Sequence, residues 1–111
     1  MKDKENFRNN KFPVVYAHIY PLLVDVAREC GYALGLHGSL RRDLDLIACP
    51  WTNEAISAEE LKDKILDSLN GVFVHEVGKM GIKPHGRVVY TIFLDNHGFI
   101  DLSIMPKHES S

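Results

Sequence analysis

Apolar residues recur at helical spacing in the first part of the chain. From Pro13 onward, the run VVYAHIYPLLVDVAREC places apolar side chains three or four positions apart. This spacing predicts an amphipathic helix with its apolar stripe at positions 15, 19, 22, 23, 26 and 30. Pro21 is expected to kink this helix or to begin its main part, and Gly31 is expected to end it.

A second helix is expected in the segment ISAEELKDKILDSLNG. Ser57 and Glu60 have the spacing of a capping box, in which each residue's side chain binds the backbone N–H of the other. The helix should therefore begin after Ser57, and Gly71 should close it.

Two strands are predicted before this second helix. Tyr32–Gly38 is a short apolar run with glycines, and Asp43–Cys49 alternates acids with leucines. Only four residues, 39–42, separate the two segments, which suits an antiparallel hairpin and is too short for a crossover helix. Pro50 is expected to end the second strand.

Three further strands are expected in the second half of the chain. Val72–Gly78 and Arg87–Leu94 have the composition of strands, and the glycine-broken stretch 79–86 between them is predicted to be a loop. Asp95–Gly98 should form the turn into the last strand, Phe99–Met105.

This order of elements predicts an α+β fold. Two helices should cover one face of a mixed, mostly antiparallel sheet, and the other face should be partly open. The 111 residues, 45% of them hydrophobic, fit one domain. We expect it to span residues 13–106, with a flexible N-terminal tail at 1–12 and a C-terminal tail at 107–111.

Charge and cysteine content narrow the class of protein. Thirteen basic and fifteen acidic residues give a net charge of −2, which argues against general nucleic-acid binding. The charged N-terminal segment lacks the apolar core of a signal peptide, and no stretch reaches the ~20 apolar residues of a membrane span, so a cytoplasmic protein is expected. Cys30 and Cys49 lie among apolar residues and are expected to be buried thiols, with a disulfide between them as the alternative.

The candidate chemistry lies on two of the predicted strands. Because side chains alternate between the faces of a strand, Asp43 and Asp45 share one face while Leu44 and Leu46 point to the core. Asp101 occupies the equivalent position in the last strand. If these two strands are neighbours, three carboxylates converge into an oxygen-rich site that suits Mg²⁺ or Mn²⁺. The alternative is an ordinary solvent-exposed face of an antiparallel sheet.

The same residues resemble the signature of the DNA polymerase beta-like nucleotidyltransferase superfamily. That signature is a glycine–serine pair after a strand, Asp-x-Asp on the next strand and a third acid later, here Gly38 with Ser39, Asp43 with Asp45, and Asp101. The resemblance implies that the acids hold two Mg²⁺ ions and that the glycine–serine backbone cradles a nucleoside triphosphate. It also implies that the third acid acts as general base for the hydroxyl of an acceptor, which the sequence does not identify.

The resemblance covers residues 32–105 and implies a minimal nucleotidyltransferase-like fold. The chain is also similar to small proteins of phages and bacteria that share a GS-x-x-RDLDLIA-x-PW core, PHGR and IDLS-x-MP. It departs from the superfamily at one point, because only Leu40, Arg41 and Arg42 separate Ser39 from Asp43. This connection is too short for a helical turn whose amides bind phosphate. Arg41 and Arg42 are then either phosphate clamps or turn charges.

Four residues outside this signature have a functional and a structural interpretation. Lys83 and Arg87, around PHGR, either line the open face and contact substrate or belong to a loop and a strand end. His37 either approaches a phosphate or metal or is structural. Trp51 either stacks on a base or packs at the sheet edge.

Two functions follow from this sequence. The first is a Mg²⁺- or Mn²⁺-dependent transfer of a nucleoside monophosphate from a nucleoside triphosphate to an acceptor. The alternative is a catalytically degenerate binding or regulatory module of the same fold, antitoxin-like or partner-binding, which the short connection before Asp43 favours.

Overall fold

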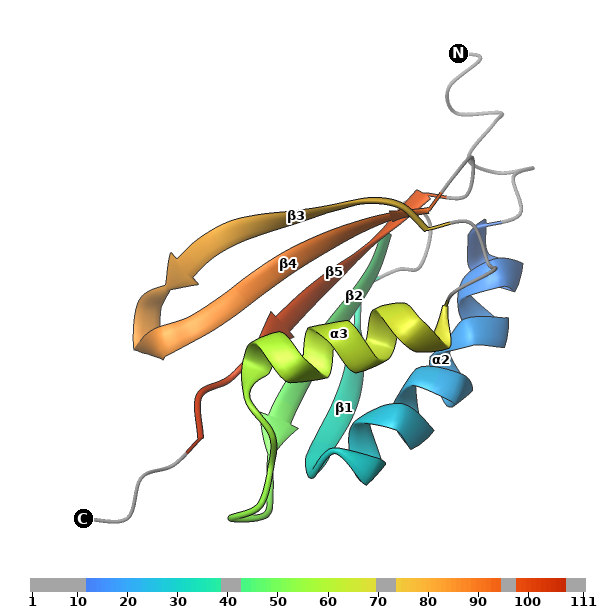
Figure 1. Ribbon diagram of the computed structural model, residues 1–111. Coiled ribbons are helices and arrows are strands. Elements are labelled where there is room, and N and C mark those ends of the chain that lie inside the picture. The colour runs from blue at the N-terminus through green and yellow to red at the C-terminus, as the bar shows by residue number, and fades with distance from the viewer. Residues whose placement is uncertain (1–11, 39–42, 70–73, 95–97, 108–111) are drawn as a thin grey trace.

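The computed structural model describes residues 12–38, 43–69, 74–94 and 98–107. Two helices lie on one face of a five-stranded sheet (Figure 1). The elements in chain order are α2 (Phe12–Glu29), β1 (Tyr32–His37), β2 (Asp43–Pro50), α3 (Ala58–Ser68), β3 (Val74–Lys83), a 3₁₀ turn (Pro84–Gly86), β4 (Arg87–Leu94) and β5 (Gly98–Ile104). The predicted α+β class is confirmed.

The sheet has the strand order β1-β2-β5-β4-β3. Strands β1 and β2 form the predicted antiparallel hairpin, and β4 pairs antiparallel with both β5 and β3. Strands β2 and β5 are parallel. This pair requires a long crossover, which is supplied by the 47-residue segment from Trp51 to His97 that contains α3, β3 and β4.

The core lies between the helices and one face of the sheet. Leu44, Leu46, Ile100 and Leu102 point into it and have no solvent exposure. These residues come from the two parallel strands, so burial of their apolar face leaves the alternate positions of β2 and β5 on the opposite face.

Helix α2 turns only part of the predicted stripe to the core, with Val26 and Cys30 partly buried against it. Ile19 and Leu23 are buried as expected, but Leu22 is 43% exposed, and Tyr16 and Ala27 are buried instead. Positions 16, 19, 23 and 27 follow the helical repeat along one line, and position 22 lies off that line. The helix continues through Pro21 and is followed by Gly31, whose φ of +89° favours glycine.

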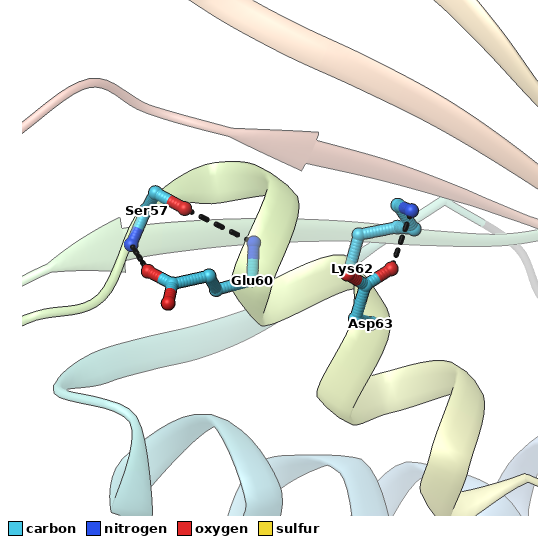
Figure 2. Close-up of polar contacts among 4 residues, drawn as sticks. All are labelled: Ser57, Glu60, Lys62 and Asp63. Atoms are coloured by element: carbon cyan, nitrogen blue, oxygen red, sulfur yellow. Dashed lines mark hydrogen bonds and ion pairs between the residues drawn. The ribbon is translucent and has the colours of Figure 1, made fainter.

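Helix α3 begins with the predicted capping box (Figure 2). The Glu60 N–H donates to Ser57 Oγ, and the Ser57 N–H donates to Glu60 Oε1, each at 3.1 Å. The helix ends at Ser68 with Leu69 as its C-cap, and Gly71 lies outside the described residues.

Strand β3 corrects the prediction of a loop at 79–86. The strand continues to Lys83, and Gly81 pairs with Val89 of β4. The pairing shifts register between Lys79 and Gly81, so the glycines that suggested a loop mark an irregularity within a strand. The turn itself is confined to Pro84–Gly86. The start predicted at Val72 and most of the predicted turn at 95–98 lie outside the described residues.

The cysteines also differ from expectation. Both thiols are free, Cys30 is half-buried, and Cys49 is exposed on the face of β2 opposite the core. The prediction of a buried thiol is therefore wrong for Cys49, because strand alternation turns it away from Ala48. In the described part of the chain, neither helix has the length and apolarity that a membrane crossing requires.

Candidate functional site

Three carboxylates meet on the open face of the sheet. Asp43 and Asp45 of β2 and Asp101 of β5 are each partly buried, and one oxygen from each lies within 4.8 Å of the others. Asp45 and Asp101 are direct register partners across the parallel pair. The convergence predicted from the sequence is confirmed.

The hydrophobic core sets this arrangement. Leu46 pairs with Leu102 and Leu44 with Ile100, all four completely buried on the helix side. A slip of one residue in either strand would move its leucines or isoleucine into solvent and its acid into the core. Burial of the apolar face therefore fixes the register of β2 and β5, and this register brings the acids together on the opposite face.

The pKa values of Asp45 and Asp101 lie above the usual range of an aspartate. The pKa of Asp45 rises to about 6, first because burial disfavours the charged carboxylate and then because of the charges of Asp43 and Asp101 and a hydrogen bond with Asp43. The charge of His37, which lies across the hairpin from Asp45, opposes this shift. Burial also raises the pKa of Asp101. A bound cation would relieve the cost of three neighbouring negative charges.

The donor set fits a hard divalent cation. All three side chains offer carboxylate oxygens, the ligands that Mg²⁺ and Mn²⁺ take together with water and phosphate. The acids therefore satisfy the chemistry of the metal site that the sequence predicted.

Gly38 lies directly against this cluster. Its φ of +89° belongs to the left-handed region, and a Cβ added there would lie 2.7 Å from Asp45 Oδ2. Glycine directly after β1 thus permits both the backbone conformation and the close approach to the carboxylate.

Thr91 of β4 is a site residue that the sequence analysis missed. It is the register partner of Asp101, is only 7% exposed, and donates a hydrogen bond from Oγ1 to Asp101 Oδ1 at 3.0 Å. This hydrogen bond lowers the pKa of Asp101 against the effect of burial. The signal in the sequence was a threonine inside the largely apolar strand segment VVYTIFL, but only the pairing of β4 with β5 identifies its partner.

Tyr16 of α2 is the second residue that was missed. Its buried hydroxyl accepts a hydrogen bond from the Phe99 N–H at 3.2 Å and donates to the Phe99 carbonyl at 3.4 Å. Phe99 is the register partner of Asp43, so Tyr16 links helix α2 to the β2–β5 pair at the level of the first acid. Burial raises the pKa of Tyr16 to about 12, and its hydroxyl is therefore a neutral donor at physiological pH.

The remaining predicted site residues are placed as follows. Ser39, Arg41 and Arg42 lie outside the described residues. Arg87 lies on the same face as the acids but four residues along β4 from Thr91, about 13 Å away at the rise of a strand. Its Nε is buried, and no acceptor among the described residues reaches it.

Two other candidates lie at opposite ends of the hairpin. His37 is exposed at the end of β1, across from Asp45. Trp51 is 68% exposed and follows β2 at the end remote from Asp43. It borders a hollow of about 230 Å³ with Val24 and Arg28, away from the acids.

Comparison with known proteins gives a structural match without a sequence match. No family model and no curated protein matches the chain. A solved structure of Cid1, described for its RNA terminal uridylyl transferase activity, matches 86% of the chain with a TM-score of 0.55 at 13% identity. A structure of the Cid1 poly(U) polymerase with MgGTP bound matches 91% with a TM-score of 0.56 at 12% identity.

The chain has a minimal nucleotidyltransferase fold. It spans only 32% and 36% of the two Cid1 chains, so the match concerns about a third of each. At this level of identity the likeness shows the nucleotidyltransferase fold alone. The acidic cluster is a separate observation, made on the chain's own residues.

Proposed function

We propose that the protein is a Mg²⁺- or Mn²⁺-dependent nucleotidyltransferase that transfers a nucleoside monophosphate from a nucleoside triphosphate to an acceptor hydroxyl. One observation carries the proposal, namely the carboxylate oxygens of Asp43, Asp45 and Asp101 within 4.8 Å of one another. The nucleotidyltransferase fold agrees with the proposal but does not carry it, because function must be argued from the site rather than from the fold.

In the proposed reaction, Asp43 and Asp45 hold the divalent cation, with Asp101 as the third ligand. When bound, the cation offsets the charge that develops on the attacking and leaving oxygens. The acceptor oxygen forms a bond to the α-phosphorus, and the bond from that phosphorus to the bridging oxygen of the leaving pyrophosphate breaks. Asp101 takes the proton of the acceptor hydroxyl, and Thr91 keeps its carboxylate oriented.

Phosphate binding falls to residues around the end of β1. We assign the backbone N–H groups of Gly38 and Ser39 to the triphosphate, with Arg41 and Arg42 as guanidinium clamps. Arg87, on the same face of the sheet, is assigned to the phosphates of a longer substrate. We also propose that the protein belongs with the small phage and bacterial proteins that share its motifs and acts in the cytoplasm.

Transfer of a labelled nucleotide tests the proposal. The purified protein is incubated with Mg²⁺ or Mn²⁺, each α-phosphate-labelled nucleoside triphosphate in turn, and fractions of a cell lysate as acceptor. We expect a labelled product that disappears with Asp43→Asn, Asp45→Asn or Asp101→Asn. Asp67→Asn is the matched control, because Asp67 is exposed on α3. Absence of product from every fraction and nucleotide would contradict the enzymatic function.

The second candidate is a degenerate binding module, which the three-residue connection between Ser39 and Asp43 favours. Binding experiments on the wild type and the same aspartate variants separate the two functions. A module that binds Mn²⁺ and nucleotide through the acids, but labels no fraction, would support binding without transfer.

A further inference from the structure

Two phenylalanine rings lie beside the acids on the open face of the sheet. Phe99 of β5 is the register partner of Asp43 on one side and of Phe93 on the other. Strand alternation places Phe99 on the same face as Asp101 and Phe93 on the same face as Thr91. The two ring centroids are 5.8 Å apart, and the ring planes are inclined by 42°.

This aromatic pair is exposed on the side away from the core. Phe93 is 39% exposed and Phe99 is partly buried. The other large hydrophobic side chains exposed in the described part of the chain lie elsewhere, on α2 (Leu22), on β1 (Leu36) and beyond β2 (Trp51). Phe93 and Phe99 are thus the aromatic surface that adjoins the acidic cluster.

We propose that Phe93 and Phe99 form a stacking subsite for the base of a nucleotide bound at the acids, an inference that rests on the proposed function. Asp43, Phe99 and Phe93 stand in one row across three strands. Neighbouring strands are ~4.8 Å apart, so the row extends on the order of 10 Å. A nucleotide with its phosphate or hydroxyl group at the carboxylates can reach along this row with its base.

Base stacking on aromatic side chains suits such a surface. Every base has a flat π-face, and an exposed aromatic ring on a sheet binds it without a specific pattern of hydrogen bonds. The pair lies on the β5–β4 side of the acids, whereas Gly38 lies on the β1 side. The base therefore comes either from the donor triphosphate or from an acceptor nucleotide, and these two sources can be separated by experiment.

Binding of base-bearing and base-free ligands tests the subsite. With Mn²⁺ present, the dissociation constants of each nucleoside triphosphate, of tripolyphosphate and of short single-stranded oligonucleotides are measured for the wild type, Phe93→Ala and Phe99→Ala. Loss of a base stack should weaken a base-bearing ligand by about fivefold to a hundredfold. Tripolyphosphate, which has no base, should bind unchanged.

Three further variants refine the test. Phe93→Trp should retain binding, whereas Phe93→Leu, which keeps an apolar side chain without an aromatic face, should behave like Phe93→Ala. Leu22→Ala is the matched control, because Leu22 is similarly exposed (43%) on helix α2. A loss for the triphosphates assigns the base to the donor, and a loss for the oligonucleotides alone assigns it to the acceptor.

The outcomes separate this inference from the proposed function. If the wild type binds base-bearing ligands and both alanine variants bind them equally well, the subsite is wrong and the proposed function stands. An equal loss for tripolyphosphate, or full binding by Phe93→Leu, would also overturn stacking. If the wild type binds none of these ligands, the proposed function fails and the subsite fails with it.

Discussion

Thr91 holds Asp101 from the neighbouring strand through a hydrogen bond of 3.0 Å between Oγ1 and Oδ1. The two residues are register partners in the antiparallel pair β4–β5, and Asp101 is in turn the partner of Asp45 in the parallel pair β2–β5. The row Asp45, Asp101 and Thr91 therefore runs across three strands. It gives the third carboxylate a fixed neighbour on each side.

Replacement of Thr91 by valine should weaken the metal site. Valine has nearly the same shape but cannot donate to Asp101, and loss of a partner that orients a metal ligand typically costs 10- to 100-fold in metal affinity or activity. We expect a loss of this order in the affinity for Mn²⁺, measured by calorimetry.

Thr91→Ser is the matched control, because it retains the hydroxyl and should restore most of the affinity. An unchanged Mn²⁺ affinity in Thr91→Val would show that the hydrogen bond does not position Asp101 for metal binding.

Asp45 should make the metal-free protein less stable as the pH rises. Its pKa of about 6 lies above the ordinary value of 3.8, so between these values the folded protein holds a proton that the unfolded chain has released. The contribution of Asp45 to the free energy of unfolding thus falls as the pH rises from 4 to 6. At pH 7 the carboxylate is charged in the folded protein, and its full destabilising effect remains. The raised pKa of Asp101 acts in the same direction.

Asp45→Asn should therefore be more stable than the wild type at pH 7 in EDTA. We expect a gain of about 1 kcal/mol, allowing for solvent screening at this partly exposed group. The gain should vanish near pH 4 in urea unfolding experiments. Addition of Mn²⁺ should stabilise the wild type but not the variant. A variant that is less stable than the wild type at pH 7 would contradict the repulsion inferred within the cluster.

Gly38→Ala should damage both the backbone and the site. A non-glycine residue in the left-handed region costs about 1–2 kcal/mol, and the new methyl group would press on Asp45 Oδ2. We expect a lower free energy of unfolding together with weaker Mn²⁺ binding.

Gly86→Ala separates the two effects. Gly86 also has a positive φ, +76°, but its added Cβ would meet Pro106 rather than an acid. This variant should lose stability and keep its Mn²⁺ affinity. Equal Mn²⁺ affinities for both variants would show that Gly38 does not shape the site.

Tyr16→Phe should destabilise the protein by about 1–3 kcal/mol, because it leaves the Phe99 N–H and carbonyl without the hydroxyl that satisfies both. Denaturant unfolding measures this cost. Tyr20→Phe is the comparison, since the Tyr20 hydroxyl makes a single hydrogen bond among the described residues, to the Leu34 carbonyl at 3.1 Å. A smaller loss for Tyr16→Phe than for Tyr20→Phe would contradict the anchoring role of Tyr16.

Local pattern was a good guide where neighbouring residues decide the structure. The alternation in DLDLIAC and FIDLSIM assigned Asp43, Asp45 and Asp101 to exposed faces, and the Ser57–Glu60 spacing identified the start of α3. Local pattern failed where pairing with another strand decides the structure. The glycines of β3 suggested a loop, but pairing with the whole length of β4 extends this strand to Lys83.

The sequence by itself determined which side chains can form the acidic site, because alternation between core and solvent is a property of each strand alone. Only the tertiary structure decided that β5 inserts between β2 and β4. That placement brings Asp101 to Asp45, Thr91 to Asp101 and Phe93 to Phe99. No local pattern specifies these pairs, since they depend on how the apolar faces of the strands pack together beneath the two helices.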